Sequence, residues 1–316
     1  MKGATCWVLT NGMAGFETQG IGIAEALGLV PVIKRVNPPA PYKWLAPRGP
    51  AAPHHDIQAP WPDLLIASGR QAIAYARMIK RASKGKTFTV VLQNPRVAPS
   101  QFDLVWAPAH DRLKGPNVIS TLVSPHRLTT NRLAKEAQRM ASELDQLPHP
   151  RIAVLIGGSN ATYTFDEAAA HHLADQLKQL ADNDGVGLMV TPSRRTGENQ
   201  TRILADTLKD KAAIVWDGTG ENPYFGFLGA ADTVIVTCDS VNMVGEACFT
   251  GKPVYIVELP GKSPKFRRFL DAIYAAGAAR PFAGVLENWD YSPLDATHEI
   301  AKAIESRFTQ RRDELK

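Results

Sequence analysis

Residues 232–259 read DTVIVTCDSVNMVGEACFTGKPVYIVEL, two short apolar runs on either side of a helical pattern. The runs at 232–236 and 253–259 are short and rich in β-branched residues, which is typical of buried strands. Asp239 or Ser240 can cap the middle segment, and Gly251 can end it. The apolar side chains of this segment recur at helical spacing, namely Val241, Val244, Ala247 and Cys248. A strand, a helix and a strand in this order predict a parallel βαβ unit.

The same alternation runs along the whole chain. Further strand-like runs lie at 5–10, 31–36, 63–69, 88–95, 102–108, 117–122, 151–158, 187–193 and 212–218. Helical patterns at 21–29, 70–83, 127–147, 164–183 and 223–231 separate them. Two successive βαβ series predict an α/β fold of two doubly wound Rossmann-like domains that face each other across a cleft. We expect a first domain over 1–148, a second over 149–294, and a C-terminal helix over 295–316 that packs on either domain.

The composition supports two packed cores in a reducing compartment. The chain has 316 residues, of which 44% are apolar and 21% charged, which is too long for one average domain and too apolar for disorder. Cys6, Cys238 and Cys248 show no metal-binding spacing and are expected to be buried thiols. No stretch approaches the roughly 18 apolar residues of a membrane-spanning helix, and the N-terminus resembles a first strand. These features predict a cytoplasmic protein.

The charge is unevenly distributed. Residues 1–148 carry a net charge of +9, whereas the remainder carries −4. A basic first domain suits an anionic membrane surface or an anionic acceptor, although a merely solvated basic surface explains it equally well. Nucleic acid is disfavoured, because the basic residues lack aromatic interleaving and no DNA-binding motif appears.

A proline-rich segment interrupts the alternation. Residues 37–62 contain eight prolines, which cannot donate to a sheet and break helices, so a long surface loop is expected. Trp44 and Leu45, beside Lys43 and Arg48, would suit insertion into a lipid headgroup layer and a peripheral membrane location. Alternatively, Trp44 and Trp61 pack back on their own domain.

Three glycine or arginine turns follow strand-like runs, where open α/β sheets bind ligands. The first contains Gly12, Gly15 and Gly20 and lacks the spacing of a dinucleotide or P-loop motif. The second and third offer backbone N–H groups, a hydroxyl and guanidinium forks to a diphosphate. Their residues are Gly157, Gly158, Ser159 and Asn160, followed by Ser193, Arg194 and Arg195. Structural turns and solvated arginines would explain them as well.

The helical segment between Ser240 and Gly251 supplies the fourth candidate. On a helical wheel Glu246 lies away from the buried stripe, on the face that it shares with Asn242 and Gly245. A carboxylate beside a position without a side chain suits close approach of a ribose, whose two hydroxyls it can accept. A lone glutamate on a helix surface is otherwise simply solvated.

The order of these features resembles the GT-B fold of nucleotide-sugar glycosyltransferases. The spacing Ser-(x)5-Glu-(x)4-Gly-x-Pro is similar to that of the N-acetylglucosaminyltransferase that forms lipid II. By this resemblance Glu246 holds the nucleotide ribose, and Ser240 caps its helix. The segment 265–280 resembles the short helix that follows in such enzymes.

A second family resembles the chain more closely. The segments SRRT (193–196), NPYFGFLGAAD (222–232), QNPR (93–96) and PAHD (108–111) are similar to the family named after a plant mitochondrial fission factor. Bacterial members of that family are sometimes labelled nucleoside-diphosphate-sugar epimerases. The family name describes an organelle phenotype and no reaction.

The resemblance leaves the catalytic base open. The position of the histidine in the lipid II enzyme is Phe16 here, with Glu17 beside it. Glu17 would serve as the base if a closed cleft raised its pKa. His110 and Asp111 follow another strand and are further candidates. No cluster of metal ligands and no cofactor motif appears, and His171 and His172 are expected to be structural or exposed.

The sequence therefore predicts a metal-independent GT-B glycosyltransferase. Its donor is a nucleotide-diphosphate sugar, its acceptor is anionic or lipid-linked, and no cofactor takes part. Two alternatives remain: a nucleotide-sugar epimerase on the same fold, and a membrane-surface adaptor with a vestigial nucleotide site.

Overall fold

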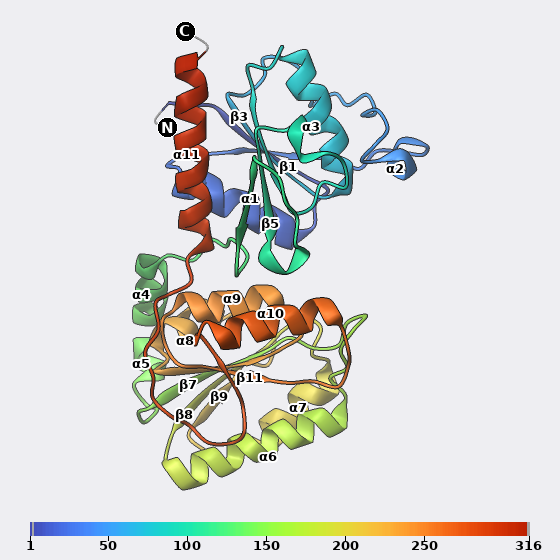
Figure 1. Ribbon diagram of the computed structural model, residues 1–316. Coiled ribbons are helices and arrows are strands. Elements are labelled where there is room, and N and C mark those ends of the chain that lie inside the picture. The colour runs from blue at the N-terminus through green and yellow to red at the C-terminus, as the bar shows by residue number, and fades with distance from the viewer. Residues whose placement is uncertain (2, 315–316) are drawn as a thin grey trace. The chain divides into compact units, whose positions relative to one another are not determined.

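The computed structural model describes residue 1 and residues 3–314, and the chain divides into two compact α/β units. The first unit comprises Met1–Arg127 and Asp295–Lys316, and the second comprises Leu128–Leu294. Each unit contains one six-stranded parallel sheet with helices on both faces (Figure 1). The predicted pair of doubly wound domains is confirmed.

The sheet of the first unit has the order β2-β1-β3-β4-β5-β6. Its strands are β1 (Cys6–Thr10), β2 (Val32–Arg35), β3 (Leu64–Ser68), β4 (Phe88–Leu92), β5 (Leu104–Pro108) and β6 (Val118–Thr121). Its helices are α1 (Ala14–Ala26), α2 (Tyr42–Leu45), α3 (Arg70–Ala82) and α11 (Ala296–Glu314), with short 3-10 turns η1 (Pro99–Gln101) and η2 (Ala109–Asp111).

The two faces of this sheet pack on different helices. Trp7 and Leu9 belong to a buried cluster that includes the apolar side of α3. On the other face, a Cβ at Gly20 of α1 would lie 2.7 Å from Val8, so this helix packs almost directly on the strand. Successive side chains of a strand point to opposite faces, which is why the alternating residues of β1 serve both cores.

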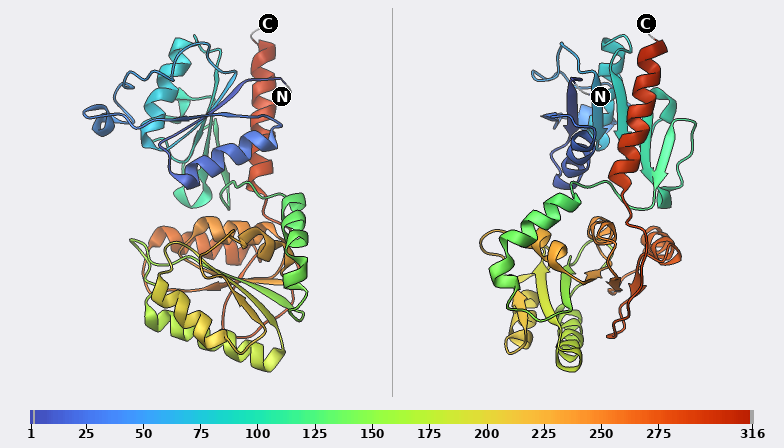
Figure 2. Two further views of the ribbon diagram at one scale, coloured as in Figure 1. Left: turned by 180° about the vertical axis from the view of Figure 1, so that it is seen from behind. Right: turned by 90° about the vertical axis from the view of Figure 1, so that its left-hand side faces the viewer.

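The C-terminal helix α11 belongs to the first unit, which the sequence had left open. It packs against α1, which crosses it at an angle (Figures 1 and 2). Its buried Phe308 meets Phe88 edge to face, with ring centroids 5.7 Å apart. The Thr297 hydroxyl accepts from the His126 N–H at 2.8 Å and donates to the His126 carbonyl at 2.9 Å.

The sheet of the second unit has the order β12-β11-β10-β7-β8-β9. Its strands are β7 (Arg151–Ile156), β8 (Gly187–Pro192), β9 (Ala213–Val215), β10 (Thr233–Thr237), β11 (Val254–Val257) and β12 (Arg280–Pro281). Its helices are α4 (Thr130–Arg139), α5 (Ala141–Leu144), α6 (Glu167–Asp184), α7 (Glu198–Leu208), α8 (Tyr224–Ala230), α9 (Val241–Phe249) and α10 (Pro264–Ala275). Helices α6 and α7 cover one face, and α9 and α10 cover the other (Figure 1).

The helical pattern at 127–147 differs from the prediction in two ways. It forms two helices, α4 and α5, which are separated at Met140, and these residues fall in the second unit. The physical reason is close packing between α4 and α8. A Cβ at Gly229 would lie 2.3 Å from the Leu133 carbonyl oxygen, and one at Gly226 would lie 2.4 Å from the Met140 sulfur. Side-chain-free positions on α8 therefore allow α4 to dock there.

The proline-rich segment is mostly loop, as predicted, with the single turn of helix α2 inside it. Trp61 packs back against Trp7, with ring centroids 6.2 Å apart. Trp44 is 73% exposed and Leu45 is 51% exposed, and α2 lies out from the sheet of its unit (Figures 1 and 2). Trp61 thus packs back on its own domain, whereas Trp44 does not. The three cysteines are buried free thiols, as expected.

Candidate functional site

The candidate site residues of the second unit cluster at the switch point of its sheet. Strands β7 and β10 are neighbours in the middle of the sheet. From β7 the strand order runs toward one edge through β8 and β9, and from β10 it runs toward the other edge through β11 and β12. The crevice beyond the carboxyl ends of such adjacent strands is where open α/β sheets bind ligands. The turns that begin at Gly157 and at Cys238 follow β7 and β10, and the turn at Ser193 follows the neighbouring strand β8.

A buried carboxylate connects these three turns. The Asp239 side chain is fully buried and accepts from the Arg195 guanidinium at 2.7 Å and from the Thr237 hydroxyl at 2.6 Å. Thr237 in turn accepts the Gly157 N–H at 2.8 Å. The Arg195 side chain remains 41% exposed and also donates to the Gly158 carbonyl at 3.3 Å. Asp239 therefore fixes one face of the arginine and leaves the rest open to solvent.

The two glycines of this turn are required by the protein's own atoms. A Cβ at Gly157 would lie 2.2 Å from an Asp239 carboxylate oxygen. At Gly158, which has φ +132°, a Cβ would lie 2.1 Å from the Arg195 carbonyl oxygen. Close packing of the three turns thus accounts for both residues, and a bound phosphate is not needed to explain them.

The remaining polar residues of these turns are largely occupied by local bonds. The Ser159 hydroxyl accepts the Phe165 N–H at 2.9 Å, and the Asn160 amide oxygen accepts the Thr162 N–H at 2.7 Å. Ser193 donates to the Gly157 carbonyl. The backbone N–H groups of Gly158 and Ser159 donate to no acceptor within the described residues. These two N–H groups, rather than the Ser159 hydroxyl, are suited to receiving an anion.

The helix that follows Asp239 is capped as the sequence indicates. Ser240 accepts the Met243 N–H at 3.4 Å, and Gly251 adopts φ +71° two residues after the helix ends. Asn242 is exposed in the first turn of α9. The prediction for Gly245 is wrong, since this glycine is buried rather than exposed beside Glu246. Because α9 packs on β10 and β11, its buried face is wider than the stripe of larger side chains alone.

Glu246 is not a solvated surface residue. Its carboxylate accepts the Tyr224 hydroxyl at 2.5 Å, and burial raises its pKa to about 7, against the lowering effects of this hydrogen bond and of the Arg132 charge. Arg132 itself lies over the Phe225 ring at 4.1 Å from the ring centroid. Burial and the Glu246 carboxylate raise the pKa of Tyr224 well above its usual range. The pair therefore holds a carboxyl that titrates near neutral pH.

Sequence reasoning missed Tyr224. The residue lies within the segment NPYFGFLGAAD, which resembles a family motif but indicates no role for the tyrosine. Its separation of 22 residues from Glu246 carries no helical or strand period, so only folding brings the hydroxyl and the carboxylate together.

Two cavities of the second unit adjoin the cluster of turns around Asp239. One, of about 430 Å³, is lined by the Ser193–Arg194 turn and by Trp216 and Asp217 at the end of β9. The other, of about 330 Å³, is lined by Tyr163, Cys238 and the charged residues Glu258, Lys262 and Arg267. Both open at the carboxyl side of the sheet, so the cluster has room on either side for a ligand.

The first unit contains the candidate base Glu17, and its environment differs from the expected one. Arg35 donates to both Glu17 carboxylate oxygens, at 2.9 and 2.7 Å, and these bonds lower the pKa of Glu17. The expected rise of its pKa is therefore wrong, because an ion pair outweighs desolvation. Neighbouring Phe16 lies on α1, where it borders Gly69.

The glycine turn of the first unit is shorter than predicted. Gly12, with φ +83°, lies in the turn, whereas Gly15 and Gly20 lie inside α1. The helix begins at Ala14, and Gly20 serves its close packing on β1. His110 and Asp111 form the η2 turn after β5, with the His110 Nε2 atom 3.8 Å from an Asp111 oxygen.

The fold is similar to that of several solved structures. The structure is similar to a putative UDP-N-acetylglucosamine 2-epimerase from Listeria monocytogenes, with a TM-score of 0.63 and 9% identity over 98% of this chain and 97% of the other. It is also similar to the UDP-GlcNAc 2-epimerase of Neisseria meningitidis bound to UDP-GlcNAc (TM-score 0.56, 10% identity, 97% and 99% coverage). MurG of Acinetobacter baumannii is a further match (TM-score 0.50, 15% identity, 98% and 95% coverage). The chain thus has the GT-B fold of glycosyltransferases and epimerases.

The family match describes the chain more specifically than the fold does. Residues 14–308 match the family Mitochondrial fission ELM1, and the chain belongs to it. The mitochondrial fission protein ELM1 of Arabidopsis thaliana is 30% identical over 277 residues, which cover 79% of this chain and 65% of the plant protein. The chain therefore spans just under two thirds of the length of that relative. An uncharacterized protein of Rickettsia prowazekii (strain Madrid E) is 26% identical over 281 residues, 77% of this chain and 79% of that protein. Among the described residues, no helix is long and apolar enough to cross a membrane.

Proposed function

We propose that the chain binds a nucleotide-diphosphate sugar in its second unit and transfers the sugar to an anionic or lipid-linked acceptor. The observation that carries the proposal is the half-buried Glu246–Tyr224 pair on α9 and α8, since α9 begins directly after β10 at the switch point of the sheet. A half-buried carboxylate with an aromatic hydroxyl beside it is costly to keep for stability alone, because burial disfavours its charge.

The donor would be held by three kinds of contact. Glu246 accepts the two ribose hydroxyls, and Tyr224 keeps the carboxylate in place. The diphosphate meets the N–H groups of Gly158 and Ser159 and the exposed side of Arg195, which Asp239 orients from behind. Arg194, Asn242 and the start of α9 at Ser240 lie at the same edge of the sheet and complete this anionic site.

The transfer step needs no metal and no cofactor in this proposal. The acceptor oxygen forms a bond to the anomeric carbon while the bond from that carbon to the diphosphate oxygen breaks. Arg195 and the helix N-terminus stabilise the negative charge on the departing diphosphate. A base takes the proton of the acceptor hydroxyl. Among the candidates in the first unit, His110 with Asp111 suits this role better than Glu17, whose ion pair with Arg35 makes it a weaker base.

The acceptor side is proposed to lie at a membrane surface. Residues 1–148 carry a net charge of +9, and the exposed Trp44 and Leu45 of α2 lie beside Lys43 and Arg48. Aromatic and leucine side chains partition into the headgroup layer while basic residues pair with anionic lipids. This arrangement supports a protein that is peripheral to a membrane.

The decisive experiment is a thermal-shift panel of UDP-, GDP-, ADP- and CMP-sugars. A ligand that binds only the folded state raises the melting temperature with its concentration. We expect one nucleotide class to stabilise the wild type and to lose this effect in Glu246→Gln. Glu143→Gln is the matched control, since Glu143 is an exposed glutamate of the same unit. Absence of any stabilisation in the wild type would refute the nucleotide-sugar proposal.

The alternatives separate in a second step. An epimerase converts the bound nucleotide sugar without an acceptor, whereas a transferase needs one, so incubation with the donor alone followed by NMR distinguishes them. The plant relative is named for mitochondrial fission, and an adaptor related to such a role would bind vesicles but no nucleotide. Vesicle binding without nucleotide binding would therefore favour the adaptor.

A further inference from the structure

The connection between β2 and β3 differs from the usual crossover of a doubly wound sheet. These parallel strands flank β1, and the segment between them normally forms a helix that covers one face of the sheet. Here the proline-rich loop takes that place. Ala52 and Ile57 of the loop are 4% and 6% exposed and join the core cluster of the first unit. The residues between them are thereby held at both ends.

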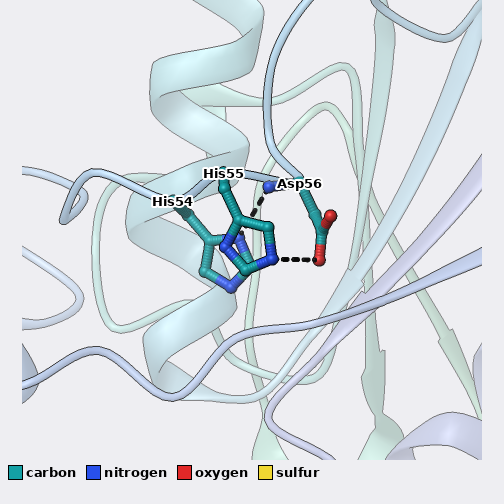
Figure 3. A group of neighbouring side chains, drawn as sticks. All are labelled: His54, His55 and Asp56. Atoms are coloured by element: carbon teal, nitrogen blue, oxygen red, sulfur yellow. Dashed lines mark hydrogen bonds and ion pairs between the residues drawn. The ribbon is translucent and has the colours of Figure 1, made fainter.

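Those residues form a tight turn with three potential metal ligands. The Ile57 N–H donates to the His54 carbonyl at 3.1 Å and closes the turn over 54–57. The Asp56 N–H donates to the Nδ1 atom of His54 at 3.2 Å, and the Nε2 atom of His55 lies 3.2 Å from an Asp56 carboxylate oxygen. Figure 3 shows that both contacts converge on Asp56.

The geometry fits a small cation. The two imidazole rings are stacked, with centroids 5.1 Å apart and planes 6° from parallel, and the His54 ring lies perpendicular to the Tyr75 ring with centroids 6.2 Å apart. One ligand atom from each of His54, His55 and Asp56 lies within 4.8 Å of the others. In a tetrahedral zinc site, bonds of about 2.0–2.2 Å place neighbouring ligand atoms about 3.3 Å apart. The contact between His55 and Asp56 already has that separation.

We propose that His54, His55 and Asp56 bind a divalent transition-metal ion of the zinc type. Two imidazoles with one carboxylate suit Zn²⁺, Ni²⁺ or Cu²⁺, whereas Mg²⁺ and Ca²⁺ prefer oxygen ligands alone. The Nδ1 atom of His54 accepts the Asp56 N–H, so its lone pair points toward Asp56. When the ion binds, a bond from this nitrogen to the metal replaces that long hydrogen bond. Three ligands leave at least one coordination position for water or another ligand.

The site opens onto a cavity that the donor site does not use. His55 and Asp56 line a cavity of about 720 Å³ together with Lys34, Trp7 and Trp61. The Lys34 amine lies 4.9 Å from the centroid of the Trp7 ring. The cavity lies within the first unit at the amino-terminal ends of β1 and β2, opposite to the edge that carries Gly12. The ion would fasten the loop beside this cavity and place a positive charge at its wall.

The test is zinc titration of the full-length protein without an affinity tag. Isothermal titration calorimetry with Zn²⁺, and with Mg²⁺ as the comparison ion, is run on the wild type, His55→Ala and Asp56→Asn. Both side chains are more than half exposed, at 86% and 57%, so neither variant should unfold the chain. The matched control is a His171→Ala, His172→Ala double variant, which removes an exposed histidine pair from α6.

We expect one Zn²⁺ per chain and no comparable response to Mg²⁺. Each ligand variant should weaken Zn²⁺ binding by at least about tenfold, since losses of that size follow even from removing a group that supports a ligand. The control variant should bind like the wild type. Zinc binding that is unchanged in His55→Ala, or that is lost in the α6 control, or that is absent in the wild type, would overturn the proposal. Because nucleotide binding is not measured in this experiment, its outcome is independent of the donor site.

Discussion

The substitution Glu246→Gln is expected to raise the stability of the protein above neutral pH while weakening its binding of the nucleotide. Burial raises the pKa of Glu246 from 4.5 to about 7, so the folded protein retains a proton that the unfolded chain releases. The contribution of Glu246 to the free energy of unfolding therefore falls as the pH rises from about 4.5 to about 7, and it is constant above that range. Glutamine keeps the acceptor for Tyr224 but carries no charge, so this fall disappears.

The size of this change in stability follows from the pKa shift of Glu246. One pKa unit corresponds to about 1.4 kcal/mol, and the interval from about pH 5.5 to the pKa near 7 thus corresponds to about 2 kcal/mol. For a unit of this length, about 2 kcal/mol changes the melting temperature by about 4–8 °C. We expect the difference in stability between Glu246→Gln and the wild type to grow by this amount between about pH 5.5 and about pH 8.

The assay is urea or thermal denaturation of both proteins at the two pH values. The nucleotide response is measured in parallel. A charged acceptor contributes about 1 kcal/mol more per hydrogen bond than a neutral one, so two ribose hydroxyls predict a loss of about 30-fold in affinity. Equal pH dependence in the variant and the wild type would show that Glu246 is not held in a desolvated site, and the reasoning would fail.

Three further substitutions test the cluster and the exposed helix. Arg195→Ala leaves the buried Asp239 carboxylate without its cation and should cost about 1–3 kcal/mol of stability. This is less than the loss of a fully buried ion pair would cost, because the arginine is 41% exposed. Adding Asp239→Asn to this variant should recover part of the loss in urea denaturation. Gly158→Ala should destabilise the protein by more than about 3 kcal/mol, because its Cβ would meet a carbonyl oxygen at 2.1 Å and its φ is +132°. The control is Gly185→Ala, which should cost about 1 kcal/mol, since φ there is +63° and no atom lies within 4 Å of the added Cβ. Trp44→Ala should leave the melting temperature within about 1 °C and lower sedimentation with anionic vesicles by about tenfold or more, since the indole is 73% exposed; unchanged sedimentation would exclude α2 from membrane contact.

Patterns of short range were sufficient to predict most elements of the fold. The alternation of short apolar runs with segments of helical spacing indicates βαβ units because parallel strands need a crossover. The cap at Ser240 and the stop at Gly251 depend on neighbouring residues in the chain, and both lie where the sequence placed them. The GT-B resemblance followed from the order of these segments.

Packing between elements far apart in the chain could not be predicted from such local patterns. The residues of α4 fall in the second unit because Gly226 and Gly229 of α8 leave room for them. Helix α11 joins the first unit because its Thr297 bonds to His126 and its Phe308 packs on Phe88. Each of these contacts joins residues far apart in the chain. No local pattern encodes which of two domains a connecting helix prefers.

The sequence by itself determined the class of fold, the strands whose carboxyl ends carry the candidate site, and the glutamate on α9. Only the tertiary structure decided the state of these residues. Glu246 meets Tyr224, Asp239 fixes Arg195, and Glu17 pairs with Arg35. The charge of a carboxyl depends on its burial and on the charges beside it, and both are properties of the folded surroundings. The sequence therefore identified the groups, and the fold determined that one carboxyl titrates near neutral pH while another stays ionised.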